Sequence, residues 1–178
     1  RLLEGLERLS RPVRIGPVGW VLHGALTVHI DFKKPRKDQA IYRYDDYRRS
    51  WSYLPSTADS TGWRATSNRP GVFAVFRDDS APKLGKPALA HELSWATGRA
   101  RREIHVPVSD TGSGFDESRT RVYVAGVRSM FRWDFVGKKL VVPLHDSSII
   151  GGQSVDVIAY DRNSNRSTRH ATVNTGAP

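Results

Sequence analysis

Three aspartates in the second half of the chain, Asp110, Asp116 and Asp161, carry the side chains best suited to hold a cation. Carboxylate oxygens are ligands that Ca²⁺ prefers, and Asp161, Asn163 and Asn165 also occupy the first, third and fifth positions of a calcium-loop register. The sixth and twelfth positions lack the Gly and Glu of an EF-hand. Calcium held by the three aspartates between two modules is therefore one hypothesis, and no cofactor is the default expectation.

The residues DTGS at 110–113 match the loop of aspartic proteases, in which two aspartates share one proton and activate a water molecule. A single copy needs Asp110 of a second chain, so this hypothesis predicts a dimeric protease. However, Ser109 stands where those enzymes place an apolar residue, and Gly114 and Asp116 continue a different pattern. A turn is the preferred interpretation, with the dimeric aspartic protease as an alternative.

Other catalytic constellations are missing from the sequence. Zinc hydrolases need His and carboxylate ligands at close spacing, such as H-E-x-x-H, and the six His of this chain are scattered. The chain has no Cys, which excludes disulfides, thiolate metal sites and a Cys nucleophile. Phosphate-binding glycine loops and the G-x-S-x-G elbow are also absent. We therefore assign no catalytic residue and expect this chain not to be an enzyme.

Basic and aromatic residues between 42 and 51 suggest a binding face instead. The candidate ligand-binding residues are Tyr42, Arg43, Tyr44, Arg48 and Trp51. Such a combination can stack on sugar rings and hold anionic groups, although alternate aromatics on a strand also belong to cores. The net charge of +10 divides evenly between residues 1–80 and 81–178, which favours adhesion to an anionic glycan over recognition of a specific nucleic acid.

The hydrophobic pattern predicts short strands, and these strands must position the residues named above. Leu26, Val28, Ile30 and Phe32 alternate with polar residues, and similar runs recur at spacings near ten residues. Leucines near helical spacing over 2–9 predict one short amphipathic helix.

The polar segment DDSAPKLGKP at 78–87 has linker chemistry, which predicts domains at 1–80 and 81–178. No apolar run is long enough to span a bilayer.

Both halves carry patterns of known bacterial modules. The first half has GPVG at 16–19, IYRYD at 41–45, WSYL at 51–54 and GVFA at 71–74, and it resembles a β-sandwich common in bacterial secreted proteins. The second half has DTGSGFD at 110–116, VYVAG at 122–126 and GQSVDVIAYDRNSN at 152–165, and it resembles bacterial immunoglobulin-like and fibronectin-like repeats. The usual ending D-x-A-G-N is changed at 161–165, so an Asn is expected to take the positive φ of the missing Gly.

The resemblance implies an all-β fold of two tandem immunoglobulin-like β-sandwiches with a short N-terminal helix. Such pairs occur downstream of catalytic domains, including lysostaphin-type metallopeptidases that cut peptidoglycan. It therefore implies a non-catalytic accessory or structural part of a secreted, periplasmic or cell-surface protein, whose partners are an upstream domain of the same polypeptide and the cell wall or an anionic glycan. A chain that starts at Arg1 is expected to be a fragment of such a protein. A carbohydrate-binding or anionic-polymer-binding module is the alternative from the residues themselves.

Overall fold

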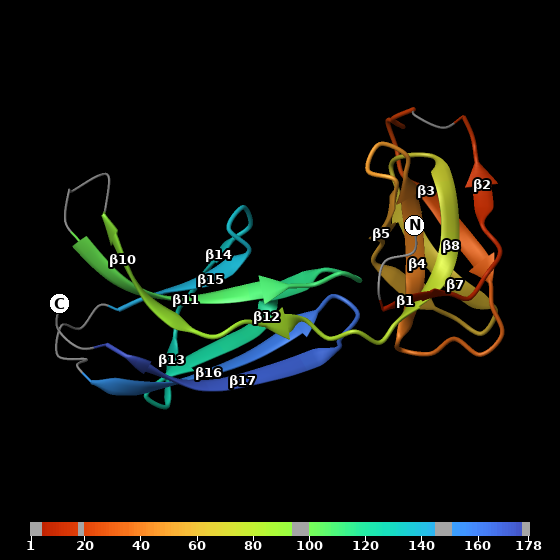
Figure 1. Cartoon of the computed structure of the whole chain (residues 1–178). Coiled ribbons are helices and arrows are strands. Elements are labelled where there is room, and N and C mark those ends of the chain that lie inside the picture. The colour runs from red at the N-terminus through yellow and green to blue at the C-terminus, as the bar shows by residue number, and fades with distance from the viewer. Residues whose placement is uncertain (1–4, 18–19, 94–99, 145–150, 176–178) are drawn as a thin grey trace. The chain divides into compact units, whose positions relative to one another are not determined.

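The structure of the chain, a computed structural model, describes residues 5–17, 20–93, 100–144 and 151–175. Every regular element in these ranges is a β-strand (Figure 1), which confirms the predicted all-β class. The described residues contain no helix with the length and apolarity of a membrane span.

The described residues form two compact units. The first unit comprises the chain up to Ala81 together with two later segments, Asp110–Gly114 and Asp161–Asn165. The second unit comprises Pro82–Ser109, Phe115–Tyr160 and the chain from Arg166 onward. The segments 110–114 and 161–165 contain two of the three aspartates singled out above, so those aspartates belong with the first unit.

The helix predicted over residues 2–9 is wrong for the part of that segment within the described ranges. Leu6–Arg8 form strand β1, which pairs antiparallel with β8 (Gly71–Asp78). An isolated helix of so few residues is not stable in water, whereas Leu6 is buried to 6% exposure by joining the sheet. Gly5 precedes the strand with φ of +86°, a conformation that Gly adopts without steric cost. Residues 1–4 lie outside the described ranges.

The first unit contains two antiparallel sheets. The larger has the order β1-β8-β4-β5, with β2 also paired to β8, and the smaller has the order β3-β7-β6. The remaining strands are β2 (Val13–Ile15), β3 (Leu26–Asp31), β4 (Gln39–Asp45), β5 (Ser50–Tyr53), β6 (Ser56–Ala58) and β7 (Gly62–Ser67). In β3, Val28 and Ile30 are buried and their neighbours are exposed, as the alternating pattern predicts.

Two apolar clusters hold the larger sheet of the first unit. One face of this sheet packs on the smaller sheet through Val28, Ile30, Ile41, Trp63, Ala65, Phe73 and Val75. The other face carries a mainly aromatic cluster of Leu6, Ala40, Tyr42, Ala74 and Phe76, with Trp51 and Tyr53 against it. Strands β4 and β8 are therefore buried on both faces, which explains why VFAVF at 72–76 shows no alternation.

The second unit also contains two sheets. Its strands are β9 (Lys83–Leu84), β10 (Ala88–Leu93), β11 (Ala100–Ser109), β12 (Phe115–Val124), β13 (Val127–Ser129), β14 (Arg132–Asp134), β15 (Lys139–Pro143), β16 (Gly152–Asp161) and β17 (Arg166–Asn174). One sheet has the order β10-β11-β15-β14 with β9 on β11, and the other has the order β13-β12-β16-β17. Branched residues of both sheets meet in one core that includes Ile104, Val122, Leu140 and Val157.

The turn at residues 161–165 differs from its predicted form. The residue with positive φ is Ser164, at +73°, and not an Asn. Ser164 stands at the position of the Gly in the usual D-x-A-G-N ending. Asn163 and Asn165 instead donate their side-chain amides to the carbonyl oxygen of Asp78, at 3.0 and 2.8 Å. The asparagines are thus used for their hydrogen-bond donors, and the serine takes the left-handed conformation.

Candidate functional site

A basic and aromatic face lies on the sheet β13-β12-β16-β17 of the second unit. In β12, Thr120, Val122 and Val124 are buried, so the alternating side chains of the strand point to the opposite face. The same holds for β16, where Val155, Val157 and Ala159 are buried. This opposite face carries Glu117, Arg119, Arg121, Tyr123, Arg128, Asp156, Ile158, Tyr160, Arg166, Thr168 and His170. We call this set the basic face.

Cross-strand pairing brings the arginines of the basic face close to its tyrosines. Arg128 on β13 lies opposite Tyr123 on β12, and Arg166 on β17 lies opposite Tyr160 on β16. The guanidinium carbon of Arg119 lies 4.5 Å from the centroid of the Tyr160 ring, within cation–π range. Aromatic rings beside cations can stack on planar or cyclic ligands while the guanidinium groups bind anions.

The acidic side chains of the basic face only partly offset its four arginines. Asp156 accepts a hydrogen bond from His170 at 2.6 Å, so this carboxylate already has a partner within the basic face. Arg121 donates through one nitrogen to the carbonyl oxygens of Ser118 and Thr120, at 2.8 and 2.7 Å, which fixes its guanidinium over the edge of β12. The face is therefore positive, with at least one arginine held in a defined place.

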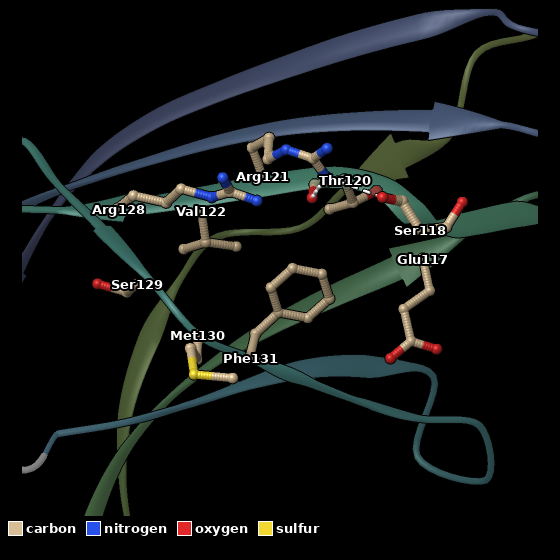
Figure 2. Close-up of a pocket in the computed structure, with 9 residues that line it drawn as sticks. All are labelled: Glu117, Ser118, Thr120, Arg121, Val122, Arg128, Ser129, Met130 and Phe131. Carbon is tan, nitrogen blue, oxygen red and sulfur yellow. Dashed lines mark hydrogen bonds between the residues drawn. The ribbon is translucent and has the colours of Figure 1, made fainter.

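A pocket of about 370 Å³ lies beside the basic face, along the edge of β12. Its lining consists of Glu117, Ser118, Thr120, Arg121, Val122, Arg128, Ser129, Met130 and Phe131. Figure 2 shows the Phe131 ring between Arg128 at one end and Glu117 at the other. Phe131 also packs against the core of the second unit, which restrains its ring. The pocket thus combines an aromatic wall, hydroxyl groups and charges of both signs.

The predicted ligand face at residues 42–51 does not lie together on one surface. Tyr42 is fully buried and donates its hydroxyl to Asp78 at 3.2 Å, so it belongs to the core. Tyr44 and Trp51 are half-buried and contact each other with ring centroids 5.3 Å apart. Arg43 alternates with the two tyrosines and faces the other side of the sheet, whereas Arg48 is exposed in the turn. The structure brings Tyr42, Tyr44 and Trp51 to one face of the sheet, where Tyr42 is buried, and places the two arginines elsewhere.

A buried carboxylate, that of Asp78, organises the polar interior of the first unit. Asp78 ends β8 and is 0% exposed. Its Oδ2 accepts from the Tyr42 hydroxyl and from the Ser113 amide at 2.6 Å, and its Oδ1 accepts from the Ser80 amide at 3.3 Å. Burial, followed by the charge of Asp78 and this hydrogen bond, raises the pKa of Tyr42, which therefore stays a neutral donor.

The DTGS motif at 110–113 closes around this carboxylate. A Cβ on Gly112 would lie 2.2 Å from Asp78 Oδ2, so no larger residue fits there without displacing Asp78. Asp110 Oδ1 accepts from the amides of Gly112 and Gly114, both at 2.9 Å, and burial raises the pKa of Asp110. Its Oδ2 is enclosed without a hydrogen-bond partner in the described structure. These contacts hold the loop 110–114 in place around Asp110 and Asp78.

The three aspartates proposed for calcium are divided between the two units. Asp110 and Asp161 lie in the first unit, near enough to Asp78 for each to feel its charge. Asp116 lies in the second unit and accepts from the amide and hydroxyl of Ser118. Within residues 5–17, 20–93, 100–144 and 151–175, no three His, Asp or Glu side chains group as a metal site. Calcium binding stays a prediction.

The basic face was not predicted from the sequence, although part of its signal is present there. Arg119, Arg121 and Tyr123 alternate with Thr120, Val122 and Val124, which is the pattern of a strand with one buried face. Strand pairing adds Arg128 opposite Tyr123 and Arg166 opposite Tyr160, each across a turn that joins the two strands. Alternation in the sequence reveals only the residues of the basic face on β12. The pairing of the strands is needed to place the residues of the other strands beside them.

Replacing Asp78 with Ala tests the hydrogen bonds that its buried carboxylate accepts. The substitution leaves the Tyr42 hydroxyl and the Ser113 amide buried without an acceptor, so we expect the free energy of unfolding to fall by roughly 2–5 kcal/mol. Asp79→Ala is the matched control, because the Asp79 side chain is 68% exposed; a change within about 0.5 kcal/mol is expected there. Equal effects of the two substitutions in urea denaturation would contradict the assigned role of Asp78.

The titration of Asp161 gives a second prediction. Burial, and then the charges of Asp78 and Asp110, raise the pKa of Asp161 to about 6 in the folded chain despite its hydrogen bonds from Asn165. The unfolded value is about 4, so the folded state binds this proton more tightly. The resulting contribution to stability is complete below about pH 4 and is lost as the pH rises through about 6.

We therefore expect the wild type to lose stability relative to Asp161→Asn as the pH rises from about 4 to about 7. Asp59→Asn is the control, because hydrogen bonds, first that from the Thr61 hydroxyl, lower the pKa of Asp59 to about 2. Its difference from the wild type should change only at more acidic pH. Urea unfolding at a series of pH values measures both differences, and a flat Asp161→Asn difference over that range would contradict the prediction.

Comparisons with known proteins add no identity: no family model, no curated protein and no solved structure matches this chain. The contacts and charges of its own residues therefore carry the argument for its function.

Proposed function

We propose that the chain is a non-catalytic accessory part of a secreted or cell-envelope bacterial protein and attaches that protein to an anionic polymer. The observation that carries this proposal is the basic face, where four arginines and two tyrosines share one side of the sheet β13-β12-β16-β17. Clustered charge of one sign concentrates an oppositely charged polymer and speeds its association. An acidic glycan of the cell envelope is the polymer class proposed.

The charge of the whole chain supports the same function. The sequence holds 28 Lys and Arg against 18 Asp and Glu. Asp78 and Asp161 are fully buried and Asp110 is partly enclosed, so they present little negative charge to solvent. The surface is therefore more positive than the residue counts indicate, and it would attract polyanions over a distance set by the salt concentration.

The architecture is compatible with an accessory role. We propose that each unit is an immunoglobulin-like β-sandwich, since in each unit two sheets share one apolar core. Such folds host many unrelated functions, so the fold alone chooses none of them. The upstream domain of the same polypeptide, and a secreted, periplasmic or cell-surface location, are parts of the proposal that follow from the resemblance of both halves to bacterial modules.

Retention on an immobilised sulfated polysaccharide tests the proposal. The double variant Arg128→Gln/Arg166→Gln removes two exposed charges from the basic face, and we expect it to elute at clearly lower salt than the wild type. The control Arg48→Gln/Arg49→Gln removes the same charge from the exposed turn after β4. It should elute close to the wild type.

The pattern of elution separates the alternatives. Equal shifts for both double variants would mean that net charge alone governs retention, which contradicts a site on the basic face. A larger shift for Arg48→Gln/Arg49→Gln, together with a loss of retention in Tyr44→Ala/Trp51→Ala, would move the site to the hairpin at 42–51. Absence of retention at low salt would remove the proposed function.

A further inference from the structure

The open pocket along the edge of β12 combines an aromatic surface with charged side chains. Its volume of about 370 Å³ lies within the usual range of small-molecule pockets. The Phe131 ring is half-buried and packs on the core of the second unit, so it offers a restrained aromatic surface. Met130, which is 86% exposed, lies next to it at the pocket rim.

Opposite charges stand at the two ends of the pocket. Arg128 and Glu117 are both exposed, and neither side chain forms a hydrogen bond or ion pair with another described residue. Figure 2 shows them on opposite sides of the Phe131 ring. Between them, Arg121 is held over the β12 edge by the carbonyl oxygens of Ser118 and Thr120. The pocket therefore offers the guanidinium of Arg128, which is unpaired among the described residues, the fixed guanidinium of Arg121 and the carboxylate of Glu117.

These groups match the chemistry of an acidic sugar. The apolar face of a pyranose ring packs on an aromatic side chain, and a sugar carboxylate pairs with a guanidinium in charge-assisted hydrogen bonds. An ionised Glu117 can only accept hydrogen bonds, which sugar hydroxyl groups donate. A polyphosphate offers no apolar face to Phe131 and no donor to Glu117, whose charge would repel it.

We propose that this pocket binds a carboxylate-bearing sugar residue of an acidic glycan, with the ring on Phe131, the carboxylate on Arg128 and a hydroxyl group on Glu117. The inference rests on the proposed function, because the pocket shares Arg121 and Arg128 with the basic face. It goes further in naming the chemistry that distinguishes one polyanion from another. The basic face supplies general attraction, and the pocket supplies selectivity for carboxylated sugars.

Binding of three probes to the full chain by calorimetry tests the inference. The probes are an oligogalacturonate, a neutral galactose oligomer of the same length and a polyphosphate of matched charge. We expect the oligogalacturonate to bind at least about tenfold more tightly than the other two at equal ionic strength. Arg128→Gln should weaken oligogalacturonate binding on the order of tenfold, and Arg166→Gln, which lies outside the pocket, should weaken it much less.

Two further variants examine the other contacts. Glu117→Gln should weaken oligogalacturonate binding several-fold while leaving polyphosphate binding unchanged or tighter. Phe131→Ala should abolish the preference for the sugar polymer; because Phe131 also contacts the core, Met130→Ala serves as a rim variant that leaves the core intact, and it should weaken the same binding less.

The outcomes distinguish this inference from the proposed function. Equal binding of oligogalacturonate and polyphosphate, with equal losses in Arg128→Gln and Arg166→Gln, would overturn the pocket and leave the basic face standing. Equal binding of the neutral oligomer would overturn the pairing of the carboxylate with Arg128. Failure of every anionic probe to bind would overturn the proposed function itself.

Discussion

In the sheets of this chain, a strand with one face in a core has to point every second side chain the other way. This constraint explains both the cores and the surfaces. Val122 and Val124 enter the core of the second unit, and the same strand therefore presents Arg121 and Tyr123 to the opposite face. Antiparallel pairing then places Arg128 of β13 beside Tyr123, and Arg166 of β17 beside Tyr160 of β16. The basic face is a consequence of how the core is built.

The first unit departs from this rule in two ways. Strands β4 and β8 are buried on both faces, so aromatic residues occupy positions that would otherwise be exposed. At the end of β8 the interior includes a carboxylate, that of Asp78, which is stable there because donors from Tyr42, Ser80 and Ser113 satisfy it. The backbone carbonyl oxygen of Asp78 in turn accepts hydrogen bonds from the side-chain amides of two asparagines. The loops 110–114 and 161–165 thus have structural roles, and of the two carboxylate oxygens of Asp110 one accepts two backbone amides and the other is enclosed.

Local pattern was enough to predict the all-β class and the alternation over residues 26–31, because both depend on neighbouring residues. It failed at residues 6–8, where pairing with β8 overrides a short helical periodicity. It also misled at Tyr42, because a hydroxyl bonded to Asp78, 36 residues away, cannot be inferred from alternation. The same limit applies to the basic face. Arg119 and Arg121 stand in one alternating run, but the pocket needs Phe131 and Glu117 to meet across the edge of a strand, which only the folded arrangement determines.

The claim that matters most is that the basic face is where the chain meets an anionic polymer. Mapping of backbone amide chemical shifts during titration with a short sulfated oligosaccharide tests it residue by residue. The account predicts that the largest changes occur at residues 117–123, 128–131, 158–160 and 166–170 and that they weaken with added salt. Changes confined to residues 42–51, or spread evenly over exposed arginines of both units, would contradict it.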